Sequence, residues 1–201
     1  ERERERILID CFGHSDSWAG NIGGRSEFKL VSWATQDRLL FVGGTTLTSA
    51  HSRNIWLSGF TGVNAWSEMS YNDALPWFSA RSNQTLVIFH DNVVVMAGMS
   101  TIISSATTST IVHNDVWVYA NTQAVELVYA NTESSAPPTP KDGAYVPYWI
   151  RVTEHAPWLP RSGMSAVVFR ERLFILGGND KNGRPIADLW VTRDLKEWTV
   201  L

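Results

Sequence analysis

The sequence contains a single cysteine, Cys11, among its 201 residues. One thiol cannot form a disulfide within the chain, and metal sites built from pairs of cysteines are excluded. A reduced intracellular compartment is compatible with this composition. One cysteine does not establish the compartment, so the localisation stays open.

The sequence also lacks basic clusters and long apolar runs. Its 17 basic and 20 acidic residues give a formal net charge of −3, and the basic residues are dispersed, unlike those of a nucleic-acid-binding surface. No apolar run approaches the roughly 18 residues that span a bilayer, and 7–9 is too short for the apolar region of a secretory signal. We therefore expect a soluble protein that binds neither nucleic acid nor membrane.

Catalytic and metal-binding patterns are missing as well. The histidines fall at unrelated points of the chain, with no spacing typical of a metal site: His14, His51, His90, His113 and His155. We expect no catalytic residue, no metal and no cofactor.

Tryptophan, in contrast, is abundant, with ten residues, which indicates a packing position that recurs in a repeat. Three short apolar runs end in a pair of small residues, as buried strands do before a tight turn. The pairs are Gly43-Gly44, Ala97-Gly98 and Gly177-Gly178. An arginine lies eight residues before an aromatic residue in each copy: Arg25 and Trp33, Arg81 and Phe89, Arg161 and Phe169.

The spacing holds downstream of the small residues. Each pair is followed by a tryptophan with Asn or Asp two positions earlier: Asn54 and Trp56, Asp115 and Trp117, Asp188 and Trp190. A second tryptophan follows at Trp66, Trp149 and Trp198. Leu75-Pro76-Trp77 then leads to Arg81, and Ala156-Pro157-Trp158 leads to Arg161. The first copy has two extra residues between its arginine and its glycines, which a hairpin loop tolerates.

Each repeat therefore predicts four strands, named a to d in chain order. A four-stranded antiparallel sheet cannot cover both of its faces alone, and radial packing of such sheets produces a β-propeller. The glycines permit sharp turns and close backbone approach, the tryptophans fill the space between sheets, and Asp115 and Asp188 are expected to bond nearby turn amides. These roles are architectural.

The pattern resembles the kelch repeat, and the resemblance covers about residues 25–201. It implies an all-β, kelch-type propeller fragment of three blades, at about 25–80, 81–160 and 161–201. Two departures are Ala97 in place of the first glycine and Asn54 in place of aspartate. Residues 1–24 are expected to be a tail with a partial fourth blade.

Function is expected on one face of the propeller. The d–a connections and the b–c loops share a face, so Arg25, Arg81 and Arg161 are candidates for binding carboxylates there. The alternative is that each arginine ties down its connector by bonding backbone carbonyls. A long Ser/Thr-rich b–c loop, 99–112, lies on this face, and an insertion between Trp117 and Trp149 projects from the other.

Because kelch propellers close with more blades, the missing blades are expected from flanking sequence or from another chain. The resemblance implies a non-catalytic scaffold for an unidentified protein partner. The alternative is a carbohydrate-active propeller enzyme that acts on an acidic sugar, as sialic-acid epimerases do.

Overall fold

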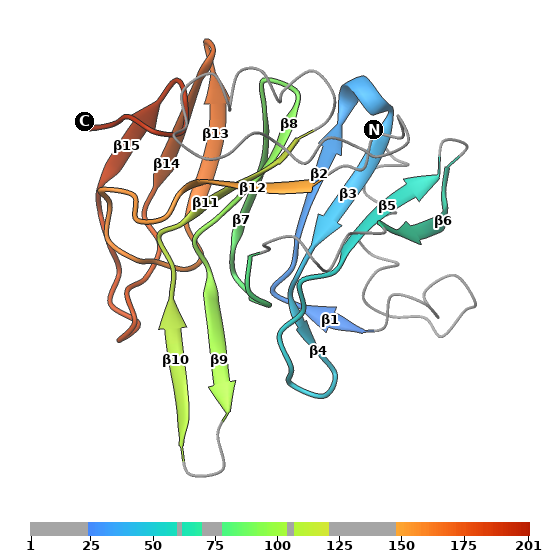
Figure 1. Cartoon of the computed structure of the whole chain (residues 1–201), viewed down its shortest axis with the longest axis horizontal. Coiled ribbons are helices and arrows are strands. Elements are labelled where there is room, and N and C mark those ends of the chain that lie inside the picture. Colours follow the sequence, from blue (N-terminus) through green and yellow to red (C-terminus); the bar gives the residue numbers. More distant parts are fainter. Residues whose placement is uncertain (1–23, 60–61, 70–77, 104–106, 121–147) are drawn as a thin grey trace, which may run out of the picture.

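The computed structural model describes residues 24–59, 62–69, 78–103, 107–120 and 148–201, and it is built from antiparallel β-sheets (Figure 1). Three four-stranded sheets follow one another along the chain as blades of a β-propeller. Blade 1 consists of β2 (Lys29–Trp33), β3 (Arg38–Val42), β5 (Ile55–Gly59) and β6 (Gly62–Glu68). Blade 2 consists of β7 (Thr85–Phe89), β8 (Asn92–Met96), β11 (Val116–Ala120) and β12 (Tyr148–Thr153). Blade 3 consists of β13 (Ser165–Phe169), β14 (Arg172–Leu176), β15 (Leu189–Thr192) and β16 (Trp198–Val200).

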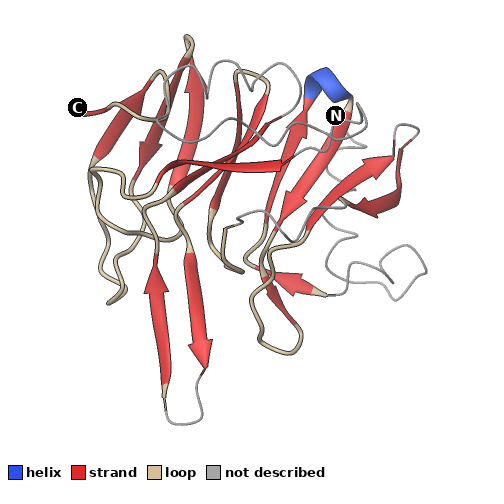
Figure 2. Cartoon of the chain, in the orientation of Figure 1, coloured by secondary structure: helices blue, strands red, loops and turns tan. Residues whose placement is uncertain are grey.

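The four strands predicted for each repeat are confirmed. Blades 2 and 3 join their first two strands through two-residue turns, His90-Asp91 and Arg170-Glu171, whose residues all have positive φ between 48° and 61°. A two-residue turn with positive φ at both residues has a backbone twist that matches the twist of the two strands it joins. Blade 1 has its two extra residues at the same place, where a single 3-10 turn, η1 (Ala34–Gln36), precedes left-handed Asp37. Figure 2 shows η1 as the one helical segment among the described residues.

Two small two-stranded sheets lie outside the blades. β1 (Arg25–Ser26) pairs with β4 (Thr45–Thr46), and β9 (Met99–Ile103) pairs with β10 (Thr108–Val112). The Ser/Thr-rich segment 99–112, which we predicted as a loop, is therefore a hairpin that projects from blade 2 (Figure 1). The expected partial blade at 1–24 and the insertion at 121–147 lie outside the described residues, apart from Gly24.

The core consists of two apolar layers, one between each pair of neighbouring blades. β8 contributes to both layers because successive side chains of a strand point to opposite faces. Val93 and Val95 pack toward blade 1, whereas Val94 and Met96 pack toward blade 3. All four are completely buried, so blade 2 is covered on both faces.

The innermost strands also carry polar contacts between blades. Gln84, just before β7, donates from Nε2 to the carbonyl of Val42 in blade 1 at 2.6 Å. The neighbouring Thr85 hydroxyl donates to the carbonyl of Met164, at the start of blade 3, at 3.1 Å. Both side chains are buried, and these bonds therefore fix blade 2 to both neighbours near the propeller axis.

The structure revises one alignment of the repeats. The aromatic side chain that occupies the linker position three residues before the arginine is Trp158 in blade 3 and Phe78 in blade 2. Both are completely buried, at 1% and 0% exposure. Trp158 contacts Trp198 edge-on at 5.9 Å, and Phe78 contacts Trp149 edge-on at 4.9 Å. Phe78 is thus the counterpart of Trp158, whereas Trp77 lies outside the described residues.

The second small residue of each pair must be glycine. Gly44, Gly98 and Gly178 have φ between 93° and 95°, a conformation that a side chain makes costly. A Cβ on Gly98 would lie 2.8 Å from Cα of Gln84, so the backbone itself blocks a larger residue. Ala97 tolerates the first position because its φ is 59°, which lies in the left-handed region open to a small residue.

We predict that Gly98→Ala lowers the free energy of unfolding by more than about 2 kcal/mol, because backbone strain and a steric clash add together. Gly183→Ala is the matched control, since Gly183 also has positive φ, 74°, but no atom within 4 Å of the added Cβ. It should cost only about 1 kcal/mol. Urea unfolding of the two variants measures the difference, and equal losses would contradict the clash.

Candidate interaction face

The d–a connectors and the b–c loops lie on one face of the propeller, as predicted. Backbone hydrogen bonds join them: the N–H of Arg81 donates to Ser52 at 3.0 Å, and the N–H of Gly44 donates to the carbonyl of Arg81 at 3.1 Å. The same pair of bonds recurs in the next blade. Arg161 donates to His113 at 3.1 Å, and Gly98 donates to Arg161 at 2.9 Å. We call this surface the connector face.

Arg81 is buried in the connector face, with 1% of its side chain exposed. Its Nη1 and Nη2 donate to the two carboxylate oxygens of Asp115 at 2.7 and 3.0 Å. The same guanidinium donates to the carbonyls of Ala97 at 3.0 Å and Ser79 at 3.1 Å. It also lies over the ring of Phe78 at 5.5 Å. This bidentate pair therefore joins the connector to strands β8 and β11.

Arg161 repeats the arrangement in blade 3. Its side chain is completely buried and forms a bidentate pair with Asp188, with Nη2 to Oδ2 at 2.8 Å. It donates to the carbonyls of Gly177 and Leu159 at 2.9 and 3.0 Å. Its guanidinium lies over the ring of Trp158 at 5.7 Å. The buried arginine therefore makes equivalent contacts in blades 2 and 3.

Each aspartate also holds the tryptophan of its own strand. The indole Nε1 of Trp117 donates to Asp115 at 2.8 Å, and that of Trp190 donates to Asp188 at 2.8 Å. Our expectation that the aspartates bond turn amides is corrected here, because the main partners of both carboxylates are the arginine and the indole. Arginine and aspartate occupy the same repeat positions in the second and third repeats although they are 34 and 27 residues apart, and this recurrence could have revealed the pair.

Blade 1 carries a weaker version of this contact. Arg25 donates to the carbonyl of Gly43 at 3.4 Å and to the Ser52 hydroxyl at 2.9 Å. Asn54 stands where the other blades have aspartate, and its side chain donates to Glu68 instead. The neutral amide at position 54 cannot form the pair that Asp115 and Asp188 form, and the carboxylate whose charge acts on Arg25 is that of Glu68.

The contacts of Arg81 and Arg161 are those expected of arginines that hold their connectors in place by bonding backbone carbonyls. Their guanidinium groups are enclosed by carboxylates and carbonyls of the chain itself, with 1% and 0% of the side chain exposed. A role for Arg25, Arg81 and Arg161 in binding a ligand stays a prediction. The remaining repeat residues lie in the blades, with the small pairs after the b strands and Trp56 stacked on Phe41 at 6.3 Å.

The ion pairs change the acidity of the aspartates. Burial alone would raise the pKa of Asp115, but hydrogen bonds and charge from Arg81, together with the indole of Trp117, hold it below its usual value. For Asp188 the hydrogen bonds from Arg161 are the main cause of a lowered pKa. Both carboxylates are therefore ionised at neutral pH.

Two backbone hydrogen bonds link the starts of the three blades in series. The residue two positions after each arginine is left-handed: Glu27, Asn83 and Gly163 have φ of 58°, 50° and 70°. The N–H of Asn83 donates to the carbonyl of Glu27 at 3.0 Å, and that of Gly163 donates to Asn83 at 2.8 Å. The sequence did not predict this series of bonds because three different residue types form it.

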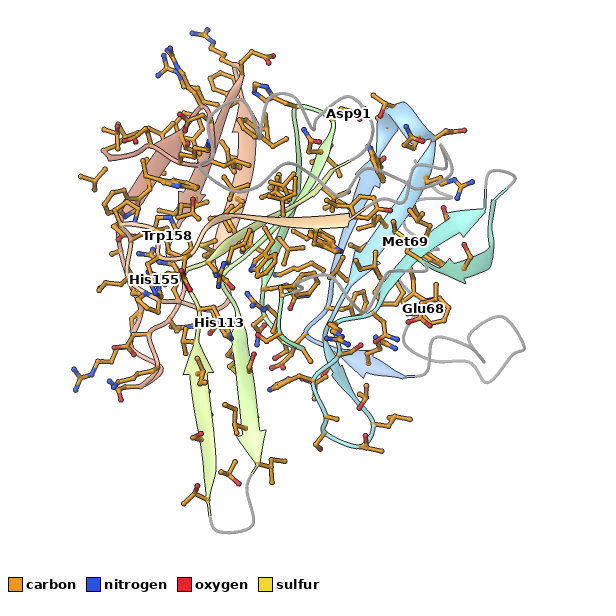
Figure 3. All side chains as sticks on the ribbon, in the orientation of Figure 1. Glu68, Met69, Asp91, His113, His155 and Trp158 are labelled. Carbon is orange, nitrogen blue, oxygen red and sulfur yellow. The ribbon has the colours of Figure 1, made fainter. Side chains whose placement is uncertain are left out.

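His113 lies at the base of the β9–β10 hairpin (Figure 3). Its Nε2 is 2.8 Å from the Ser100 hydroxyl and 3.3 Å from that of Ser79. Burial and the nearby charge of Arg81 lower its pKa to about 4, against the opposing charge of Asp115. His113 is therefore neutral at pH 7 and ties the hairpin to the linker by neutral hydrogen bonds.

Beyond its base the hairpin is exposed and apolar in part. Ile102, Ile103 and Ile111 have exposures of 50%, 76% and 41%, and Leu159 in the next connector has 63%. Segment 99–112 contains no charged residue. Large exposed aliphatic side chains that gather on one projecting element are typical of protein-binding surfaces.

Within the described ranges, no three or more of the side chains His, Cys, Asp and Glu are grouped as metal ligands. Cys11 and His14 lie outside those ranges. Among the described residues no helix is long and apolar enough to cross a membrane.

Comparisons with known proteins support the fold. The solved structure of YjhT matches this chain with a TM-score of 0.61 at 14% sequence identity. The match covers 89% of this chain and 46% of YjhT, so the chain spans less than half of the length of that protein. The likeness extends to the fold alone. No family model and no curated protein matches the sequence.

We predict that Asp115→Asn lowers the free energy of unfolding by about 3 kcal/mol at pH 7, because it leaves the buried charge of Arg81 without a counter-charge. Glu154→Gln is the matched control. It removes an exposed partner of Arg151, and such surface pairs contribute less than about 1 kcal/mol.

The same variant tests the pH dependence. A carboxyl whose pKa is lower in the folded state stabilises the protein above its unfolded pKa, about 3.9, and that contribution is lost as the pH falls. The stability difference between wild type and Asp115→Asn should therefore shrink below about pH 4, as measured by urea unfolding. A difference that is constant down to pH 2 would show that the ion pair does not carry it.

Proposed function

We propose that this chain is a protein-binding module that uses the β9–β10 hairpin of its connector face. The observation that carries the proposal is the hairpin itself, an uncharged element with exposed isoleucines that projects beyond blade 2 (Figure 1). A hairpin is not needed to close the blade, since the corresponding b–c segments of blades 1 and 3 connect without one that projects as far.

The arginines of the repeat give no support to an acidic-sugar site, because their charges are met within the chain. An acidic sugar needs cationic side chains that are accessible to its carboxylate. Arg81 and Arg161 instead bind Asp115 and Asp188 within the chain. Binding through exposed aliphatic side chains requires no such group and follows the usual chemistry of protein interfaces.

The first experiment identifies the partner and then measures its affinity. A photoreactive amino acid placed at position 102 is used to crosslink binding proteins in the cells that produce this protein. The same amino acid at position 171, in the turn on the opposite face, is the control for non-specific crosslinking. The protein enriched at position 102 is purified and titrated calorimetrically against the wild-type chain. The double variant Ile102→Lys, Ile103→Lys should weaken binding at least tenfold, because it places charge in an apolar contact.

The matched control is Arg170→Ala with Glu171→Ala, which changes two exposed residues of the turn on the opposite face. It should leave the dissociation constant unchanged. Affinity that is lost in the control, or retained in the hairpin variant, would contradict the proposal. Thermal stabilisation of the wild type by one member of a sugar-acid panel would favour the carbohydrate alternative instead.

We also propose that a further blade, from flanking sequence or another chain, covers the outer face of blade 3. In blade 2, Val87, Phe89 and Met96 are at most 9% exposed because blade 3 packs on them. Their counterparts Val167, Phe169 and Leu176 are 58%, 58% and 53% exposed. The same repeat positions are thus buried where a neighbour follows and exposed where none is described.

An uncovered apolar face of this kind promotes self-association. We predict that the isolated 201-residue chain associates in a concentration-dependent manner, and that Val167→Lys with Phe169→Lys reduces this association. Sedimentation velocity at several concentrations measures the effect. Ile102→Lys with Ile103→Lys places the same charges on the hairpin and serves as the control. A wild-type chain that stays monomeric at about 100 μM would contradict the need for a covering blade.

A further inference from the structure

One edge of the β9–β10 hairpin has a defined set of backbone groups that point outward. Met99 both donates to and accepts from Ser82, each at 2.9 Å, on the side of β9 that faces away from β10. In an antiparallel pair, residues directly opposite each other direct their backbone groups the same way, either both toward the partner or both away. Val112, which lies opposite Met99, therefore points its N–H and C=O away from β9.

The alternation along a strand extends this assignment. Thr110 and Thr108 lie two and four residues from Val112, so their backbone groups point outward as well. Ser109 and Ile111 direct theirs toward β9 and hold the hairpin together. β9 and β10 form a two-stranded sheet with no third strand in the described chain. The outer edge of β10 is thus a row of alternating donors and acceptors that no described strand pairs.

The edge of β9 differs from that of β10 because the chain itself contacts it. Ser82 pairs with Met99 at the base. Further along, the ring of His51 lies 2.9 Å from the Thr101 hydroxyl. An added strand could therefore pair with the free edge of β10, whereas Ser82 and His51 already contact the edge of β9.

Edge strands are usually protected from pairing by charge, proline or a bulge. Segment 99–112 contains no charged residue and no proline, and the register of the hairpin has no bulge. The edge residues Thr108, Thr110 and Val112 are all β-branched, which favours extended structure. The sequence thus leaves this edge open to strand addition.

A groove runs beside the same edge. It has a volume of about 500 Å³ and is lined by Thr110, Ile111 and Val112 of β10, by Leu159 and Pro160 of the connector, and by Asp180, Lys181 and Asn182 of blade 3. Ile111 and Leu159 give it two exposed aliphatic side chains, 41% and 63% exposed. A strand paired with β10 would have alternate side chains over these residues.

We propose that an extended segment of the protein partner adds to β10 as a third, edge strand. This inference rests on the proposed protein-binding function and specifies its mode. Backbone hydrogen bonds to Thr108, Thr110 and Val112 would hold the segment, and its alternate side chains would pack on Ile111 and Leu159. Where it lies over Ile111 and Leu159 the segment carries β-branched side chains, because these favour extended structure and the two aliphatic residues offer no charge to pair with one that is buried.

The probe is a capped hexapeptide, Thr-Val-Thr-Val-Thr-Val, titrated into the full chain. Amide exchange of Thr108, Thr110 and Val112, followed by NMR, should slow at least tenfold at saturation because their N–H groups become hydrogen-bonded. Two N-methylated peptides give the backbone control, one methylated on the threonines and the other on the valines. Only one set of amides faces β10, so one peptide should lose binding and the other retain it.

Thr110→Pro is the decisive protein variant. It removes an N–H that points outward, so the pairing of β10 with β9 is retained, and proline is tolerated at an edge. Thr110→Val is the matched control, which keeps the N–H and the β-branched shape. Proline should weaken the peptide and the purified partner at least tenfold, and valine should leave both unchanged. Unchanged binding to Thr110→Pro would overturn the inference.

The outcomes separate this inference from the proposed function. A partner that binds Thr110→Pro normally but loses affinity for Ile102→Lys with Ile103→Lys would overturn strand addition and leave the protein-binding role standing. A partner that binds both variants normally would end both proposals. A wild-type dimer that Thr110→Pro dissociates, detected by sedimentation, would overturn the inference by making a second copy the occupant of the edge.

Discussion

The structure depends on a buried guanidinium that each of the last two blades receives from its preceding connector. Arg81 and Arg161 leave water and are matched there by Asp115 and Asp188 in bidentate pairs. A buried charge is tolerated only where its counter-charge and hydrogen bonds are complete. This ion pair consequently fixes the connector against the end of the b strand and the start of the c strand. The arrangement of these three segments determines the shape of the connector face.

The same contact recurs at the centre of the connector face in blades 2 and 3, whereas the b–c segments at its periphery differ between blades. The guanidinium groups of Arg81 and Arg161 are directed inward, so the outward surface is made by the b–c segments that they anchor. These segments are free to differ, since the ion pair is formed by residues on either side of them. Blade 2 extends its segment into β9 and β10, with neutral His113 bonding the base of the hairpin to Ser79 and Ser100.

The relation between neighbouring blades follows from side-chain alternation. β8 is apolar on both faces because it lies between two sheets, and each of its faces completes a different layer. β14 has the same pattern, with Leu173 and Ile175 buried against blade 2 and Leu176 exposed on the other side. One repeat sequence thus encodes two packing surfaces, and the environment of a blade decides whether both are covered.

The sequence alone determined the strands, their order and the face on which the arginines lie. It could do so because these features follow from local periodicity and from spacing that is repeated within the chain. The partner of each arginine, the place of Phe78 in the linker and the series of backbone bonds through Glu27, Asn83 and Gly163 were decided by tertiary structure. Each of these involves groups distant in sequence or backbone atoms that carry no residue signature. The hairpin at 99–112 escaped prediction for a related reason: its serines and threonines suit loops and strands alike, and only the anchored base at His113 and Met99 selects the paired form.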